Sequence, residues 1–168
     1  EQYKYFTATN NPIAVTFATE LMQWLDVLQN ESTRINWDYH VLYQTRVSFC
    51  ESHLLLRLEM SYLLGEHDKS LNFIEMLDEV IKDSNIRPER PYYYFYKALV
   101  FSKEAERLTN KREKGKYERE IKRCMRALHK YAKCGPDNYE HLYMLLEALK
   151  YRSQCKPDKA MLYFDRAI

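Results

Sequence analysis

Small and aromatic side chains recur at fixed distances in residues 141–168. Their order is small, aromatic, small, aromatic, small, and the residues are Ala148, Tyr151, Ala160, Phe164 and Ala167. Where two antiparallel helices cross closely, a small residue must lie at the point where the two backbones approach each other. We therefore expect a helix hairpin with Ala148 and Ala160 at the crossing. The other three side chains would fill the space between this hairpin and its neighbours.

This order of residues resembles a tetratricopeptide unit. The alternative is an ordinary amphipathic helix pair, because its apolar stripe also recurs every three or four residues. Five matches at fixed offsets favour the repeat. Earlier units fit less well, because Ala98 and Phe101 match in an overlong hairpin and Ser70 and Leu77 stand where alanines are usual. The pattern predicts a tetratricopeptide-like stack of antiparallel helix hairpins with irregular units.

The composition also favours an all-α fold. Three glycines and five prolines in 168 residues are too few for an all-β protein, which needs turn residues every eight to twelve positions. A formal net charge of +2 gives no general case for binding nucleic acid or membranes. The sequence has neither a long apolar run nor a signal-peptide pattern. Its cysteines lack the spacing of a disulfide framework, so we expect a reducing cytoplasm. Because the sequence begins with Glu1, we expect a piece of a longer protein.

Prolines, glycines and asparagines divide the chain into seven expected helices. These cover residues 13–29, 37–64, 68–82, 92–108, 114–133, 137–154 and 157–168. Gly65 supplies a left-handed residue that ends the second helix, and Pro91 and Pro157 suit the first turn of a helix. We expect one helical-repeat domain over 1–168, with a flanking segment and helix in 1–35 and three hairpins in 36–168.

The four cysteines, at positions 50, 124, 134 and 155, form no C-x-x-C pair and are expected to be free thiols. A zinc site built from Cys124, Cys134 and His129 lacks the closely spaced ligand pairs of structural zinc sites. We therefore expect no metal and no cofactor.

Catalytic motifs are not apparent in the sequence. Three isolated glycines cannot form a phosphate-binding loop. Ser48, Ser52 and His53 lie in one helical stretch without a third group that would orient a base, and His53 is expected on a helix surface or half-buried. The carboxylates of Glu75, Asp78 and Glu79 are more typical of a solvated acidic helix face than of a metal site.

A basic face is the best candidate for contacting a partner. Lys116, Arg119, Arg123 and Arg126 follow three- and four-residue steps, so they share one side of a helix that is expected to begin near residue 114. One interpretation is a solvated helix, supported by an expected Glu118–Lys122 pair. The other is a surface for an acidic protein partner, and nucleic acid is less favoured.

Several longer stretches resemble a known region. They are Pro91–Leu99 (PYYYFYKAL), His129–Ala132 (HKYA), Cys134–Asn138 (CGPDN), His141–Ala148 (HLYMLLEA) and Tyr163–Ile168 (YFDRAI). Together they resemble the helical-repeat region of large multi-sensor signalling proteins, the serine/threonine-kinase-like and hybrid histidine kinases. The resemblance is best over residues 50–168. Two positions depart from it, since that family usually has tryptophan at Tyr131 and glycine at Cys155.

In that family a predicted ATPase module precedes this region, and a GAF sensor with a histidine kinase often follows it. The resemblance implies a non-catalytic scaffold that spaces these parts, and it brings no catalytic residues. The alternative is a freestanding adaptor that binds a peptide or protein partner. We also expect apolar surface on the last helix, at Leu162, Phe164 and Ile168, to stay open and to allow pairing with another copy.

Overall fold

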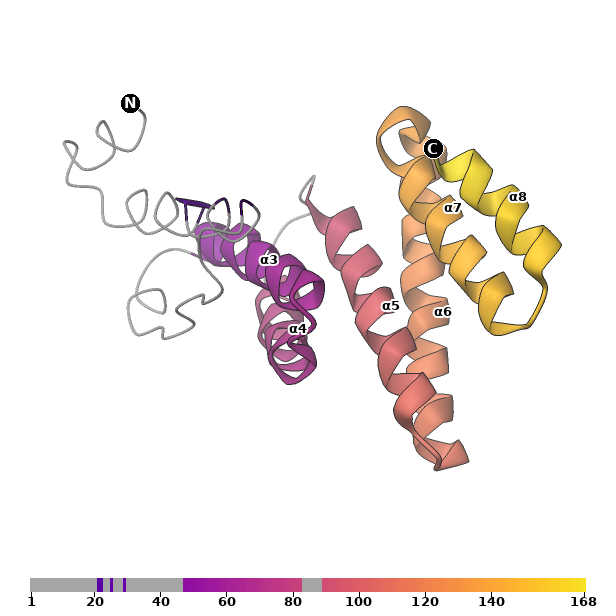
Figure 1. Cartoon of the computed structure of the whole chain (residues 1–168). Coiled ribbons are helices and arrows are strands. Elements are labelled where there is room, and N and C mark those ends of the chain that lie inside the picture. Colours follow the sequence, from indigo (N-terminus) through magenta and orange to yellow (C-terminus); the bar gives the residue numbers. More distant parts are fainter. Residues whose placement is uncertain (1–20, 23–24, 26–28, 30–46, 83–88) are drawn as a thin grey trace.

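The computed structural model describes residues 21, 22, 25, 29, 47–82 and 89–168, with the side chains of the first long helix described from Glu51 onward (Figure 1). Residues 47–82 and 89–168 contain six helices and no strands. The helices are α3 (Val47–Leu63), α4 (His67–Lys82), α5 (Arg90–Arg107), α6 (Lys111–Cys134), α7 (Pro136–Ser153) and α8 (Pro157–Ala167). The all-α class is confirmed for the described part. Most of the expected helix 13–29, and residues 37–46 of the next, lie outside it.

Local signals place the helix ends close to their expected positions. Proline lies in the first turn of α5, α7 and α8, where its missing N–H leaves no hydrogen bond unmade. Helix α6 begins at Lys111, earlier than expected. The reason is Asn110, whose side-chain oxygen accepts a hydrogen bond from the backbone N–H of Arg112 at 2.9 Å and so caps the helix.

The turn after α3 is closed by two backbone hydrogen bonds. The N–H of Glu66 donates to the carbonyl of Ser61 at 2.8 Å, and the N–H of Gly65 donates to the carbonyl of Tyr62 at 3.1 Å. Gly65 has φ of +74°, the left-handed conformation that this helix-ending turn requires.

The turn after α7 has the same construction. The N–H of Lys156 donates to the carbonyl of Tyr151 at 3.0 Å, and the N–H of Cys155 donates to the carbonyl of Arg152 at 3.0 Å. Cys155 takes the place of Gly65 and has φ of +54°. The two turns therefore align these hairpins residue by residue.

The helices pack in sequential pairs, α3 with α4, α5 with α6 and α7 with α8. The chain reverses direction at each short connection, as Figure 1 shows. Helix α6 also packs on α7, while α5 contacts both α3 and α7. One buried cluster joins α3, α4 and α5, around Leu58, Leu77 and Val100. A second joins α5, α6 and α7, around Ala98 and Leu128.

Across the described ranges, none of the helices is both long and apolar enough to cross a membrane.

Candidate protein-binding cleft between helices α4 and α6

A charged residue is buried at the same place in α3, α5 and α7. Each is preceded four residues earlier by a ring side chain and followed at once by a fully buried aliphatic residue. The triplets are His53, Arg57 and Leu58 in α3, Tyr93, Lys97 and Ala98 in α5, and Tyr143, Glu147 and Ala148 in α7. Residues four apart share one helix face, so in each of the three helices the ring and the buried charge lie on the same face.

In α5 this position holds a cation that is paired inside the protein. Lys97 is 7% exposed, and its Nζ donates to both carboxylate oxygens of Asp78 in α4 at 2.7 Å and to the Tyr93 hydroxyl at 2.9 Å. The Tyr93 hydroxyl itself donates to Asp78. The ammonium also lies 5.3 Å and 5.4 Å from the ring centroids of Tyr93 and Phe101. All three of its protons therefore have acceptors, as a buried charge requires.

Asp78 lies only partly on the solvated acidic face that the sequence predicts for it. Its side chain is 44% exposed, but it joins α4 to α5 through Lys97 and Tyr93. Glu75 and Glu79 are exposed, as a solvated face requires. Burial, and then the hydrogen bond to Asp78, raise the pKa of Tyr93 far above its usual value, so its phenol stays protonated as a donor.

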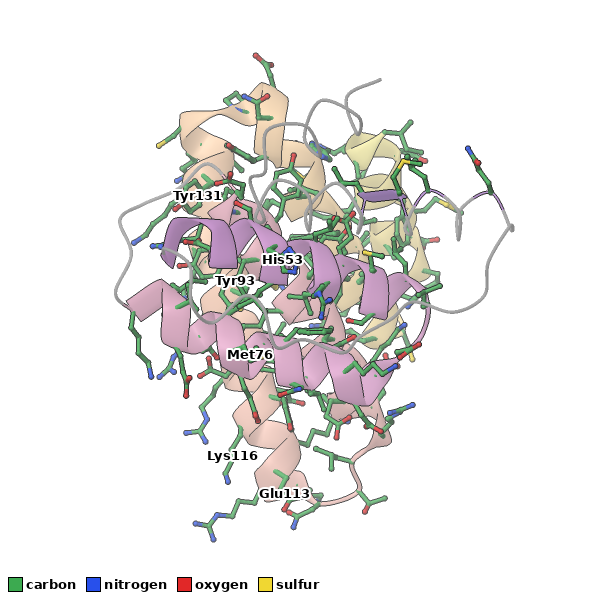
Figure 2. The ribbon with its side chains drawn as sticks, turned by 90° about the vertical axis from the view of Figure 1, so that its left-hand side faces the viewer. His53, Met76, Tyr93, Glu113, Lys116 and Tyr131 are labelled. Carbon is green, nitrogen blue, oxygen red and sulfur yellow. The ribbon has the colours of Figure 1, made fainter. Side chains whose placement is uncertain are left out.

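A cleft of about 490 Å³ opens beside this network. Helix α4 lines it with Asp78, Ile81 and Lys82, α5 with Tyr93, Tyr94 and Lys97, and α6 with Glu120, Arg123, Cys124 and Ala127. The volume lies within the range of ligand-binding clefts in proteins. Figure 2 shows Tyr93 beside α4, and Glu113 and Lys116 at the end of α6 that extends past α4.

Cys124 faces this cleft but is only 3% exposed. Burial raises the pKa of its thiol to about 12, although the Lys97 charge acts in the opposite direction. A protonated thiol is a poor nucleophile and a poor metal ligand at neutral pH. Cys134 and Cys155 are exposed. Across the described ranges, no group of three or more His, Cys, Asp or Glu side chains could hold a metal ion, so Cys124, Cys134 and His129 are not brought together.

The four residues of the basic face are exposed along α6. Arg123 pairs with Glu120 and lines the cleft, whereas Arg119 and Arg126 donate from Nε to backbone carbonyls of their own helix, at 3.1 Å and 3.2 Å. The expected pair between Glu118 and Lys122 does not occur among the described ion pairs. Of the basic face, Arg123 is the residue that reaches the cleft.

The residues expected at helix crossings or between hairpins differ in burial. Ala98 and Ala148 are fully buried, and Ala160 is 4% exposed. Tyr151, Phe164 and Ala167 are half-buried, and the ring of Tyr151 stacks on that of Tyr163 with centroids 5.2 Å apart.

The tyrosines of α5 divide between inward and outward positions. Tyr93 is buried and Tyr92 is 39% exposed. Tyr94 lies 6.3 Å from the ring of Tyr131, the position where the resembling family has tryptophan, and Tyr131 in turn contacts Tyr139.

Two features of this site were missed from the sequence. His53 is 2% exposed, not on a surface or half-buried, because α3 turns that face into the protein. The Lys97–Asp78 pair was not anticipated either. The sequence carried one signal for this pair, because a ring residue stands four positions before a charged residue in α3, α5 and α7. That signal is hard to recognise, since the charge is positive at Lys97 and negative at Glu147.

No known family model, curated protein or solved structure matches this chain.

Proposed function

We propose that this chain is a tetratricopeptide-like scaffold that binds and positions other proteins or domains and performs no chemistry of its own. The observation that carries the proposal is the shared register of α3, α5 and α7, in which a buried charge precedes a fully buried Leu58, Ala98 or Ala148. A recurring position of this kind is typical of helix hairpins stacked as repeats.

The helix contacts support the same proposal. In a stack of hairpins, each first helix packs on its own partner and on the first helix of the next hairpin. Helices α3 and α5, and then α5 and α7, are in contact in that way, and α6 packs on the first helix of the following hairpin. Repeat stacks use their extended surfaces for binding, so this arrangement supports a role in protein interaction.

We further propose that the scaffold belongs to a multidomain cytoplasmic signalling protein and spaces an ATPase module from a sensor-kinase part. This proposal is supported by the family resemblance of residues 50–168. Sequencing the gene on both sides of the segment tests it. A phosphate-binding loop upstream or a GAF domain downstream is the expected result, whereas a gene that encodes this domain alone would favour a freestanding adaptor.

The interaction role is tested by crosslinking and mass spectrometry on the protein isolated from its own cells. We expect recurrent crosslinks from lysines of this chain to a second protein or to another domain of the same polypeptide. A variant with a disrupted stack, Ala98→Asp, is the control and should lose them. Crosslinks confined to the chain itself would contradict the proposal.

A further inference from the structure

We propose that the cleft between α4 and α6 binds an acidic segment of a partner protein. An apolar side chain of that segment lies in the cleft. Its carboxylates lie against Lys82 and Arg123 at the rim, and against Arg119 and Arg126 on the same side of α6. This inference rests on the proposed scaffold function and assigns it a place and a partner chemistry.

The first argument is the charge left over at the cleft. Lys97 is fully engaged by Asp78 and Tyr93. Arg123 donates from Nη1 to Glu120 but is 69% exposed, so the other N–H groups of its guanidinium stay open to a carboxylate. Lys82 then remains as an exposed cation on the α4 side. On the α6 side, the described part of the chain shows no acidic partner for Arg119 or Arg126. Uncompensated charges of one sign around a cleft attract segments of the opposite sign.

The second argument is the apolar surface between those cations. Ile81, Tyr94 and Ala127 line the cleft and are half-buried, one from each of the three helices. Lys97 also lines the cleft, but all three of its ammonium protons are bound by Asp78 and Tyr93, so the interior of the cleft offers no open cation for a carboxylate. An aliphatic or aromatic side chain therefore fits inside, and acidic groups fit at the rim.

A nucleic acid fits this surface less well than a protein. The carboxylates of Asp78 and Glu120 line the cleft and would repel phosphates spaced regularly along a strand. The ring of Tyr94 already lies against Tyr93, at 5.5 Å, and against Tyr131, so it is not an open platform for a base. A protein segment can place its few charges where the rim accepts them.

The probe is a fluorescein-labelled peptide of alternating glutamate and phenylalanine, titrated with the whole chain and followed by fluorescence anisotropy. We expect saturable binding that weakens as sodium chloride is added, because the rim charges are exposed to solvent. Two matched peptides, lysine–phenylalanine and glutamate–serine, should bind more weakly. Equal binding of the glutamate–serine peptide would overturn the apolar part of the proposal.

Three variants locate the site. Arg123→Gln and Lys82→Gln should each weaken binding about two- to five-fold, the effect of one exposed charge contact. Ala127→Glu places a carboxylate inside the cleft and should weaken binding more than either. Lys156→Gln is the matched control, because it removes the same charge from an exposed position in the turn before α8, which does not line the cleft. Circular dichroism and thermal melts verify that each variant is folded.

Each other result has a definite meaning. Equal losses for Lys156→Gln and Arg123→Gln would indicate nonspecific attraction and overturn the cleft assignment. Competition by single-stranded DNA at lower concentration than the acidic peptide would assign the surface to nucleic acid. Sedimentation showing that the peptide dissociates a dimer would assign the cleft to a second copy. If Ala127→Glu keeps every crosslink to the native partner, the cleft proposal fails while the scaffold function stands.

Discussion

Gly65 and Cys155 occupy the same left-handed position in equivalent turns, with φ of +74° and +54°. For an L-residue with a Cβ this conformation costs about 1 kcal/mol or more relative to glycine, because the Cβ approaches the following carbonyl oxygen. The backbone hydrogen bonds of the turn hold Cys155 in place despite that cost. Cys155 is exposed, so packing of its thiol contributes little stability that could offset this cost.

Replacing Cys155 by glycine should therefore stabilise the protein by about 0.5–1 kcal/mol, once the greater freedom of glycine in the unfolded chain is included. The expected readout is a rise of a few degrees in the thermal midpoint.

Gly65→Ala is the matched reverse change. A Cβ at Gly65 would meet nothing within 4 Å, so its expected loss of about 1 kcal/mol comes from the backbone alone. A lower melting temperature for Cys155→Gly would mean that the Cys155 side chain itself supports the turn.

At the scale of the element, a small residue follows each of these turns at the same distance. In α4 it is Ser70, which is 1% exposed and bonded through its hydroxyl to Ser61 at 2.9 Å. In α8 it is Ala160, which is 4% exposed. A shared small position supports close approach of the two helices in each hairpin.

Ala160→Leu should overpack the contact between α7 and α8 and cost about 1–3 kcal/mol. Urea unfolding followed by circular dichroism measures the change. Met161→Leu is a suitable control, since Met161 is 63% exposed and the volume of the side chain hardly changes. If both variants unfold at the wild-type midpoint, Ala160 does not lie at a crossing and the repeat assignment loses its main support.

At the scale of the whole molecule, helices α4 and α8 differ in how they are covered. Phe73, Ile74 and Leu77 of α4 are buried in the cluster that includes α5. Their equivalents in α8, counted from the turns, are Tyr163, Phe164 and Ala167, which are half-buried. Met161 and Leu162 of α8, and Ile168 directly after it, are exposed by more than half.

We predict that this surface of α8 pairs with another copy of the chain. Its mass in solution should rise with concentration, because exposed apolar area of this kind favours association. Leu162→Glu should reduce the association, whereas Gln154→Glu adds the same charge at an exposed turn residue and should not. Light scattering over a concentration series measures both. A monomer at every concentration would contradict the prediction.

A second prediction for the whole molecule concerns alkaline pH. Burial raises the pKa of Cys124 from 9.0 to about 12, and the pKa of Tyr93 also rises through burial and its bond to Asp78. The folded state thus keeps protons that the unfolded chain releases. Stability should therefore be full below about pH 9 and fall between about pH 9 and 12, by up to about 1.4 kcal/mol per pH unit for each such group.

Urea unfolding at several pH values between about 8 and 11 measures this slope. Cys124→Ala should reduce the dependence of the unfolding free energy on pH. The packing lost with the thiol lowers stability by the same amount at every pH, so it does not change this slope. Cys134→Ala, at an exposed position, should leave it unchanged. Identical slopes for the two variants would show that Cys124 is not the source.

The helices and their ends were predictable where local chemistry acts within one turn. Proline in the first turns of α5 and α8, and glycine after α3, gave boundaries within two residues of those observed. The start of α6 was placed three residues late, because the capping bond of Asn110 is a contact of one side chain and not a feature of apolar periodicity. The exposure of the basic face along α6 followed from the helical spacing of its residues.

The sequence by itself determined an all-helical chain in the described part and the residues at which its helices begin and end, because these depend on neighbours a few positions apart. Only the tertiary structure decided which charges are buried and which partners they meet. Lys97 and Asp78 lie on different helices, and their bond depends on how α4 lies against α5. The same placement brings Arg123, and not Arg119, to the cleft. The physical reason is that helical periodicity specifies a face, whereas the packing of one helix on another specifies what that face meets.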